Sequence, residues 1–383
     1  MASLIHSIRD NAVYASGYLQ GRYFALPRSI TELYALLASK FTRLITLPLP
    51  FLSFVLLPFF GSTSTTISVA FFYLTWSALV LSHDQLTLEL YGTLLVRGLC
   101  FAVPALIFLG IDWALPSFSK GLKNRGAKQL PREQLDRNKL LEVIGISLAN
   151  VLLAIALQGL LELLFTEVFH VRSILRVTTI VPLPWNILKD IAIGFALRGI
   201  LMYAAHRYLL HTYDTPLKDW HLQWQHSISL PFSLAAAYDH PVNHLVAQWL
   251  PTFLPAYLFR FHVLTWHLFL ALCSLEELFV FSGYAVLPSS IVLLGMARRM
   301  DEHFAAVDEG KAIGNFGRSG VLDFICGTTC KDEGDAFDDL QSEAEKHSVK
   351  QRAENAVNGA VSGIRGKQRP KQGIRGRGQA SQT

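Results

Sequence analysis

The segment 203–244 holds six of the thirteen histidines of the chain. These residues are His206, His211, His221, His226, His240 and His244. The segment follows directly after a long apolar run, so we expect its histidines where a membrane helix meets water. Neutral imidazole is the commonest nitrogen ligand for iron, zinc and copper. The pattern therefore predicts a metal site at the surface of a bilayer.

The first two histidines of the segment, His206 and His211, are five residues apart at the end of a predicted helix. At 3.6 residues per turn, this spacing puts the second side chain about 140° beyond one full turn, so the two do not share a helical face. A local π-bulge would bring both to one ion, and such bulges often mark functional sites. The alternative is that both are interfacial histidines in contact with lipid headgroups.

The later histidines of the segment also come in closely spaced pairs. His221 and His226 are again five residues apart, and His240 and His244 are four apart, a spacing that puts both on one face of a helix. Ionisable residues at a membrane boundary cost free energy unless they are used. We therefore favour a metal site over six unconnected surface histidines.

His303 is isolated in the sequence ARRMDEHF. It joins the predicted metal site only if the chain returns it to the other histidines. Asp301 and Glu302 beside it would then accept hydrogen bonds that orient its imidazole, or else pair with Arg298 and Arg299.

Composition indicates a membrane protein. Of the 383 residues, 51% are hydrophobic and only 16% are charged, whereas soluble domains carry about 25% charged residues. The net charge of +5 is concentrated at the two ends and in one loop, so it bears on membrane topology and not on a nucleic-acid partner.

Four apolar runs are close to the roughly 20 residues that cross a bilayer core: 66–82, 94–113, 143–168 and 185–210. A further apolar run, residues 44–60, contains three prolines that oppose a straight helix, and it is expected to be interfacial or re-entrant. With four spans, the basic residues of the N-terminal lead and of the loop 118–139 both face the cytosol. The histidine segment then faces the cytosol as well.

Residues 248–288 are apolar again and long enough for a hairpin that enters the membrane and returns. Within it, Glu276 and Glu277 are expected to be intramembrane carboxylates, which are either functional groups or partners of Arg260. His262 and His267 fit packing or channel roles better than metal binding. Residues 331–383 have an acidic and then Gly-, Gln- and Arg-rich composition that predicts a disordered tail.

Six motifs in order between residues 190 and 330 resemble a fungal branch of the fatty acid hydroxylase/sterol desaturase superfamily. They are HRYLLH (206–211), WxHSIxxPFS (224–233), YDHP (238–241), RFH (260–262), SGYxVLP (282–288) and NFGxxGxLDxxxGT (315–328). The resemblance divides the chain into an N-terminal lead (1–65), transmembrane helices (66–185), a hydroxylase-like domain (186–330) and the tail (331–383).

The resemblance implies an all-α, polytopic membrane bundle with a cytosolic, histidine-rich cap that holds a di-iron centre. It also implies O2-dependent hydroxylation or desaturation of a lipid, with electrons from cytochrome b5 or a reductase. The endoplasmic reticulum membrane is the simplest location for such a chain without a cleavable signal pattern. The implied metal ligands are His206, His211, His221, His226, His240, His244 and His303.

The chain departs from the family pattern at several expected ligands. Gln225, Phe281, Met300 and Phe304 stand where relatives carry histidine, and Asn243 replaces a glutamate. The di-iron shell is therefore incomplete unless other oxygen or nitrogen donors complete it. The alternative function is a relative that lost catalysis and now binds lipid or acts as a scaffold. A transporter or receptor is disfavoured by the ordered histidine motifs. The lipid, whether sterol, sphingolipid or fatty acyl chain, stays open.

Overall fold

The computed structural model describes residues 65–284 and 295–330, with side chains from residue 71 onward. Within these ranges every regular element is a helix, in agreement with the predicted all-α class. The re-entrant segment expected at 44–60 and the tail expected at 331–383 lie outside the described residues.

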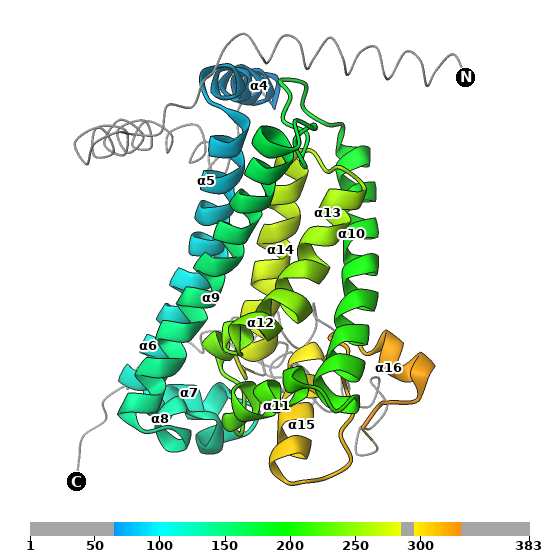
Figure 1. Cartoon of the computed structure of the whole chain (residues 1–383). Helices are drawn as coiled ribbons and strands as arrows, with labels where there is room; N and C mark the ends of the chain where they lie inside the picture. The colour runs from blue at the N-terminus through cyan, green and yellow to red at the C-terminus, as the bar shows by residue number, and fades with distance from the viewer. Residues whose placement is uncertain (1–64, 285–294, 331–383) are drawn as a thin grey trace, which may run out of the picture.

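Long helices lie side by side in the body of the bundle (Figure 1). α5 (Gln85–Arg97) continues through a π-helical turn, η1 (Gly98–Ala102), into α6 (Val103–Ala114). Both α9 (Arg137–Leu163) and α14 (Val263–Phe281) pack against α5.

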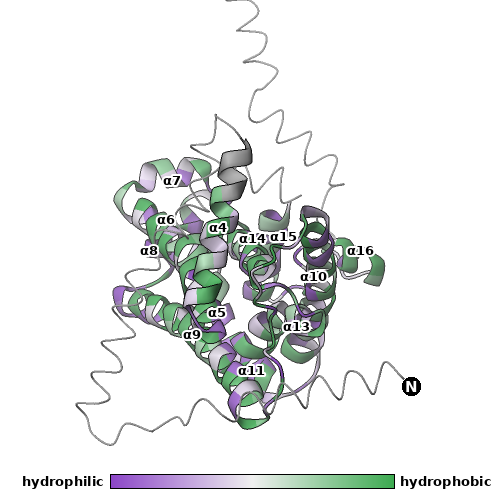
Figure 2. Cartoon of the chain, turned by 90° about the horizontal axis from the view of Figure 1, so that it is seen from above, coloured by the Kyte–Doolittle hydropathy of each residue, from purple (hydrophilic) through white to green (hydrophobic). Residues whose placement is uncertain are grey.

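Among the described residues, three helices are long and apolar enough to cross a membrane, at 85–114, 137–168 and 263–281. The second of them includes η3 (Leu164–Val168) after α9. Large apolar side chains on α9 point away from the core, with Leu152 57% and Leu160 53% exposed, and hydrophobic residues predominate along these helices in Figure 2. Such a surface fits lipid and not water. The chain is therefore a polytopic helical membrane protein.

The predicted spans agree with these helices in part. The runs 94–113 and 143–168 lie within two of the three candidates, which begin earlier, at Gln85 and Arg137. The run 185–210 forms α10 (Pro184–Ala204) and the start of the next element, but it is not one of the three. The run 66–82 forms α4 (Thr65–Ser82), which lies across one end of the bundle (Figure 1). The number of crossings stays a prediction.

The apolar hairpin predicted at 248–288 corresponds to α13 (Leu250–Leu258) and α14, joined by a turn at residues 259–262. α13 packs along α10. Arg260 adopts a positive φ of 47° in this turn.

Short helices gather at the end of the bundle opposite α4 (Figure 1). They include α7 (Pro116–Leu122), η2 (Gly126–Gln129), α8 (Pro131–Gln134), α11 (Pro216–Gln223), η5 (Gln225–Ser227), η6 (Ser233–Ala237), α12 (Pro241–Asn243), α15 (Met296–Asp308) and α16 (Val321–Cys326).

The basic loop 118–139 is folded into this end. Asn124 Nδ2 and Gln129 Nε2 donate to the two carboxylate oxygens of Asp301 on α15, at 3.0 and 2.7 Å. Lys123 forms a buried ion pair with Asp112 at 2.8 Å. The loop therefore fixes the helix that carries His303.

Gly283 is required where the loop meets the end of α14. Its φ is +73°, and a Cβ added there would lie 2.3 Å from Gln129 Nε2. We expect Gly283→Ala to destabilise the protein by about 1–3 kcal/mol, the usual cost of such a backbone conformation in a residue other than glycine. Thermal unfolding in detergent measures this, with Gly110→Ala as the control, because a Cβ there meets open space. An unchanged melting temperature for Gly283→Ala would contradict the contact.

Candidate metal centre

A π-helix brings the first histidine pair together. α10 continues beyond Ala204 as η4 (Ala205–Thr212), which confirms the predicted π-bulge. The i→i+5 hydrogen bonds of a π-helix place residues five apart about one turn apart. His206 Nε2 and His211 Nε2 accordingly lie 3.2 Å from each other. Pro216 begins α11 soon afterwards, at a helix position that proline favours.

The second pair is formed by a change of direction in the chain. His221 lies in the last turn of α11, and His226 lies in the short 3₁₀ helix η5. Their ring centroids are 4.8 Å apart. The ring of His211 lies 5.0 Å from that of His221 and 5.2 Å from that of His226, so the two pairs form one group.

α15 places His303 next to these four histidines. This was the condition for His303 to belong to the predicted metal site. Its ring centroid is 4.7 Å from that of His206, 5.0 Å from His211 and 5.2 Å from His226. Nitrogen donors of His206, His211, His226 and His303 all lie within 4.8 Å of one another. We call these four residues and His221 the imidazole cluster.

Each anchored ring of the cluster turns Nε2 inward. His206 Nδ1 bonds the carbonyl of Phe316 at 2.8 Å, and His303 Nδ1 bonds the carbonyl of Gly314 at 2.8 Å. Because a carbonyl only accepts, these Nδ1 atoms carry the protons and leave the Nε2 atoms as acceptors. In the absence of metal, Nε2 of His206 accepts from Nε2–H of His211. His221 Nδ1 bonds the carboxylate of Asp239 at 2.7 Å. This is the arrangement that orients imidazoles toward a metal.

Burial leaves several inward nitrogens without a protein partner. Among the described residues, Nε2 of His221, His226 and His303 is buried and makes no hydrogen bond. Leaving buried polar atoms unpaired is costly, so an absent group is expected to satisfy them. A metal ion fits this donor set.

The electrostatic environment keeps the cluster neutral. Burial, together with the neighbouring imidazoles, lowers the pKa of His206, His211 and His226 well below the ordinary value. Burial also lowers the pKa of His303 to about 4, although the hydrogen bond to the carbonyl of Gly314 acts to raise it. Neutral imidazole, the form that binds metals, therefore predominates at pH 7.

His240 and His244 are not brought into the imidazole cluster. His240 precedes Pro241, so it adopts an extended conformation and caps α12 instead of sharing a helical face with His244. Its ring stacks on Trp220 at 4.1 Å. His244 begins η7 (His244–Trp249) and is buried beside a separate cavity.

We expect His240→Phe to leave metal binding unchanged, because phenylalanine retains the stacking on Trp220 and His240 donates nothing to the imidazole cluster. Bound metal per purified chain is the measurement. A loss comparable to that of a cluster variant would show that His240 is a ligand.

The replaced ligand positions are apolar or bonded to the backbone. Phe281, Met300 and Phe304 belong to one hydrophobic core, and the Phe304 ring lies 4.8 Å from that of His226. Gln225 Nε2 donates to the carbonyl of Ala235 at 3.2 Å. Asn243 Nδ2 donates to the carbonyl of Leu217 at 2.8 Å. Asn243 Nδ2 also donates to the Asp239 carboxylate at 3.3 Å.

Asp239 and the two carbonyl groups are site components that the sequence analysis missed. Asp239 stands in the YDHP motif, next to His240. Its position there was the one sequence feature that could have indicated its role. Asn150 of α9 fixes its backbone by donating to its carbonyl at 2.8 Å.

Two expected pairings are wrong. Asp301 and Glu302 do not orient His303. Asp301 accepts from Asn124 and Gln129. Glu302 accepts from Arg298 at 3.0 Å, which confirms the alternative pairing expected for it.

Arg260 does not pair with Glu276 or Glu277. It donates to the carbonyl of Ser173, and it lies in the turn before α14, about 20 Å along that helix from Glu276. The actual partners of the two glutamates are Arg97, Arg198 and Arg318.

One family model matches the part of the chain that contains this site. Residues 191–328 match the family model of the fatty acid hydroxylases. The match supports the resemblance to the fatty acid hydroxylase/sterol desaturase superfamily, and the matched part contains the whole imidazole cluster and Asp239. No solved structure matches the chain.

Proposed function

We propose that the protein is a membrane-bound iron oxidoreductase that hydroxylates or desaturates a lipid with O2. The observation that carries this proposal is the convergence of five imidazoles within the segment that matches the fatty acid hydroxylases. Bound iron would supply the O2 activation that no side chain can provide for an unactivated C–H bond. The chain supplies the donors, their orientation and an apolar surround.

The residues of the cluster fit one ion better than two. A metal–imidazole bond is about 2.0–2.1 Å long, so opposite donors of one ion lie about 4 Å apart. Two ions held about 3.5–4 Å apart would need a wider shell. The donors of four rings already lie within 4.8 Å of one another. The di-iron centre that the resemblance implies would need ligands where Met300 and Phe304 stand.

Aromatic side chains would exclude water from the reacting carbon. The Phe316 ring lies 5.4 Å from that of His211 and 5.8 Å from that of His303. Phe304 covers His226 at 4.8 Å. An acyl chain or sterol entering from the bilayer would meet this apolar surround, with electrons delivered from the cytosol by cytochrome b5 or a reductase. We further propose the endoplasmic reticulum membrane as its location.

The test is lipid oxidation by the purified protein. The chain would be reconstituted in lipid nanodiscs with ferrous ion, O2 and a reductase system, and the lipids analysed by mass spectrometry. We expect a product that has gained one oxygen or lost two hydrogens, and none with His226→Ala. The second candidate, a non-catalytic lipid-binding relative, is favoured by the replacements at Gln225, Met300 and Phe304. It predicts lipid bound without any oxidised product, and that result would overturn the enzyme proposal.

A further inference from the structure

α16 presents an apolar face outward at the edge of the bundle. Phe324 and Ile325 are 83% and 70% exposed, and Val321 at the start of the helix is exposed as well. Figures 1 and 2 both show α16 outermost, beside α10. An exposed apolar patch marks an interaction surface, because burying it is favourable.

An apolar ridge on α10 leads toward this patch. Residues spaced by four form a continuous ridge along a helix. Four apolar residues of α10 follow one another at this spacing and are all exposed: Leu188, Ala192, Ala196 and Ile200. Like the exposed leucines of α9, such a ridge fits the acyl chains of a bilayer.

The ridge ends at residues that are typical of a membrane–water boundary. Tyr208 of η4 is exposed, and Arg207 donates to the Tyr203 hydroxyl at 2.7 Å. Tyrosine is enriched at the interface, and arginine near a helix end extends to it. Tyr203 also hydrogen-bonds Thr328, two residues beyond α16, at 3.1 Å. α16 therefore lies at the level where acyl chains give way to headgroups.

The inner side of α16 is tied to the loop that orients the imidazole cluster. Asp323 is fully buried, and its two carboxylate oxygens accept from the backbone N–H groups of Phe316 at 2.9 Å and Gly317 at 2.8 Å. Arg299 of α15 adds an ion pair at 3.3 Å. Because the carbonyl of Phe316 orients His206, the position of α16 bears on the position of that ring.

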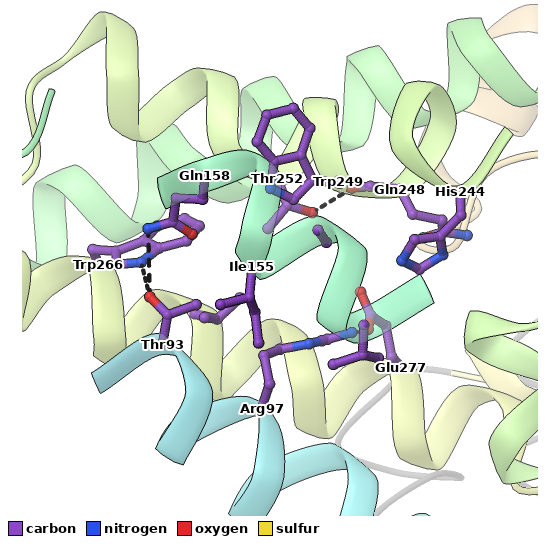
Figure 3. A pocket seen from close by; sticks show the side chains of 13 residues that line it. Thr93, Arg97, Ile155, Gln158, His244, Gln248, Trp249, Thr252, Trp266 and Glu277 are labelled. Carbon is purple, nitrogen blue, oxygen red and sulfur yellow. Dashed lines mark hydrogen bonds and ion pairs between the residues drawn. The ribbon is translucent and has the colours of Figure 1, made fainter. Parts of the chain in front are cut away.

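The same loop is held on its other side by the bundle. Arg318 donates to Gln248 at 2.6 Å, and Gln248 lines the separate cavity that Figure 3 shows. Arg318 also lies 4.0 and 3.9 Å from the carboxylates of Glu276 and Glu277. The loop is therefore fixed between α16 and the bundle, and a shift of α16 would displace it.

We propose that the outer face of α16 enters the bilayer leaflet nearest the imidazole cluster, with phospholipid acyl chains as its partner. The contact positions the loop 314–317, and Phe324 is a positioning residue for the rings that this loop holds. The membrane contact stands on the exposed face of α16 and its continuity with α10. Its effect on metal binding rests on the metal centre proposed above.

Photocrosslinking of the full-length protein in phosphatidylcholine nanodiscs tests the contact. Phe324 would be replaced by its photoreactive analogue benzoylphenylalanine, which bonds to nearby C–H groups on irradiation, and the peptides analysed by mass spectrometry. We expect a phospholipid adduct on the peptide that contains residue 324. Glu309 is the control position, because it is exposed beyond the end of α15 and should give no lipid adduct there.

The other outcomes of this experiment overturn the contact. A crosslink from residue 324 to a second copy of the chain, or to another segment of the same chain, would mean that protein covers α16. The absence of any crosslink would mean that α16 faces water.

Iron affinity in nanodiscs tests the positioning role. Phe324→Gln removes apolar area from the outer face, and we expect it to weaken iron binding about tenfold, at the lower end of the effect of residues that orient ligands. Phe324→Leu keeps the face apolar and should bind iron as the unaltered protein does. Competition with a chelator measures both variants.

Equal iron affinities of Phe324→Gln and Phe324→Leu would overturn the positioning role. If the unaltered protein binds no iron, the positioning role fails together with the proposed metal centre, whereas the crosslinking result still decides the membrane contact.

Discussion

Replacing His226 by alanine is expected to abolish metal binding and any lipid oxidation. Its Nε2 is buried, without a partner in the described part of the chain, and its ring lies 4.8 Å from that of His221 and 5.2 Å from that of His303. Loss of this imidazole opens a coordination position. The neighbouring Phe304 cannot fill it, because a phenyl ring offers no donor atom. Even residues that only orient metal ligands contribute about 10–100-fold to affinity, so a ligand should contribute more.

Bound iron per chain, measured by mass spectrometry after gel filtration, tests this prediction. His267→Ala is the matched control, since it removes a buried imidazole from α14, outside the imidazole cluster. The control should retain its iron. Normal iron content in His226→Ala, or a large loss in His267→Ala, would mean that the metal lies elsewhere.

The second large effect is expected from Asp239→Asn. The Asp239 carboxylate accepts from His221 Nδ1 at 2.7 Å and so directs His221 Nε2 toward the other rings. The amide has the same shape but no charge, and it holds the imidazole less firmly in that tautomer. We expect metal affinity to fall by about 10–100-fold.

Competition with a chelator of known affinity measures the change, and a melting curve checks the fold. Glu142→Gln serves as the control, because Glu142 accepts from the neighbouring Tyr238 at 3.0 Å without touching the imidazole cluster. If Asp239→Asn binds metal as tightly as the unaltered protein, His221 is not part of the metal shell.

The parts of the site that depend on local geometry were predictable from the sequence. If His206 and His211 bind one ion, their five-residue spacing calls for a widened helix, and η4 is such a helix. The apolar run after residue 248 allowed the chain to return His303 to the imidazole cluster, where its ring lies 4.7 Å from that of His206.

The parts that depend on long-range contacts were not predictable. The carbonyls of Gly314 and Phe316 orient imidazoles because of the path of a loop, and any residue type has a carbonyl. Arg97 and Glu277 are 180 positions apart, so no periodicity relates them. His240 was misplaced for a local reason, since the following proline keeps it out of the helix that His244 extends.

The most direct test of the account is the number of iron ions bound by each chain. The protein would be purified in detergent without its metal, reconstituted with excess ferrous ion, freed of unbound ion by gel filtration, and analysed for iron against protein mass. We expect one iron per chain, and none in His226→Ala. Two irons per chain would contradict the single-ion shell, and none in a folded protein would contradict the metal centre itself.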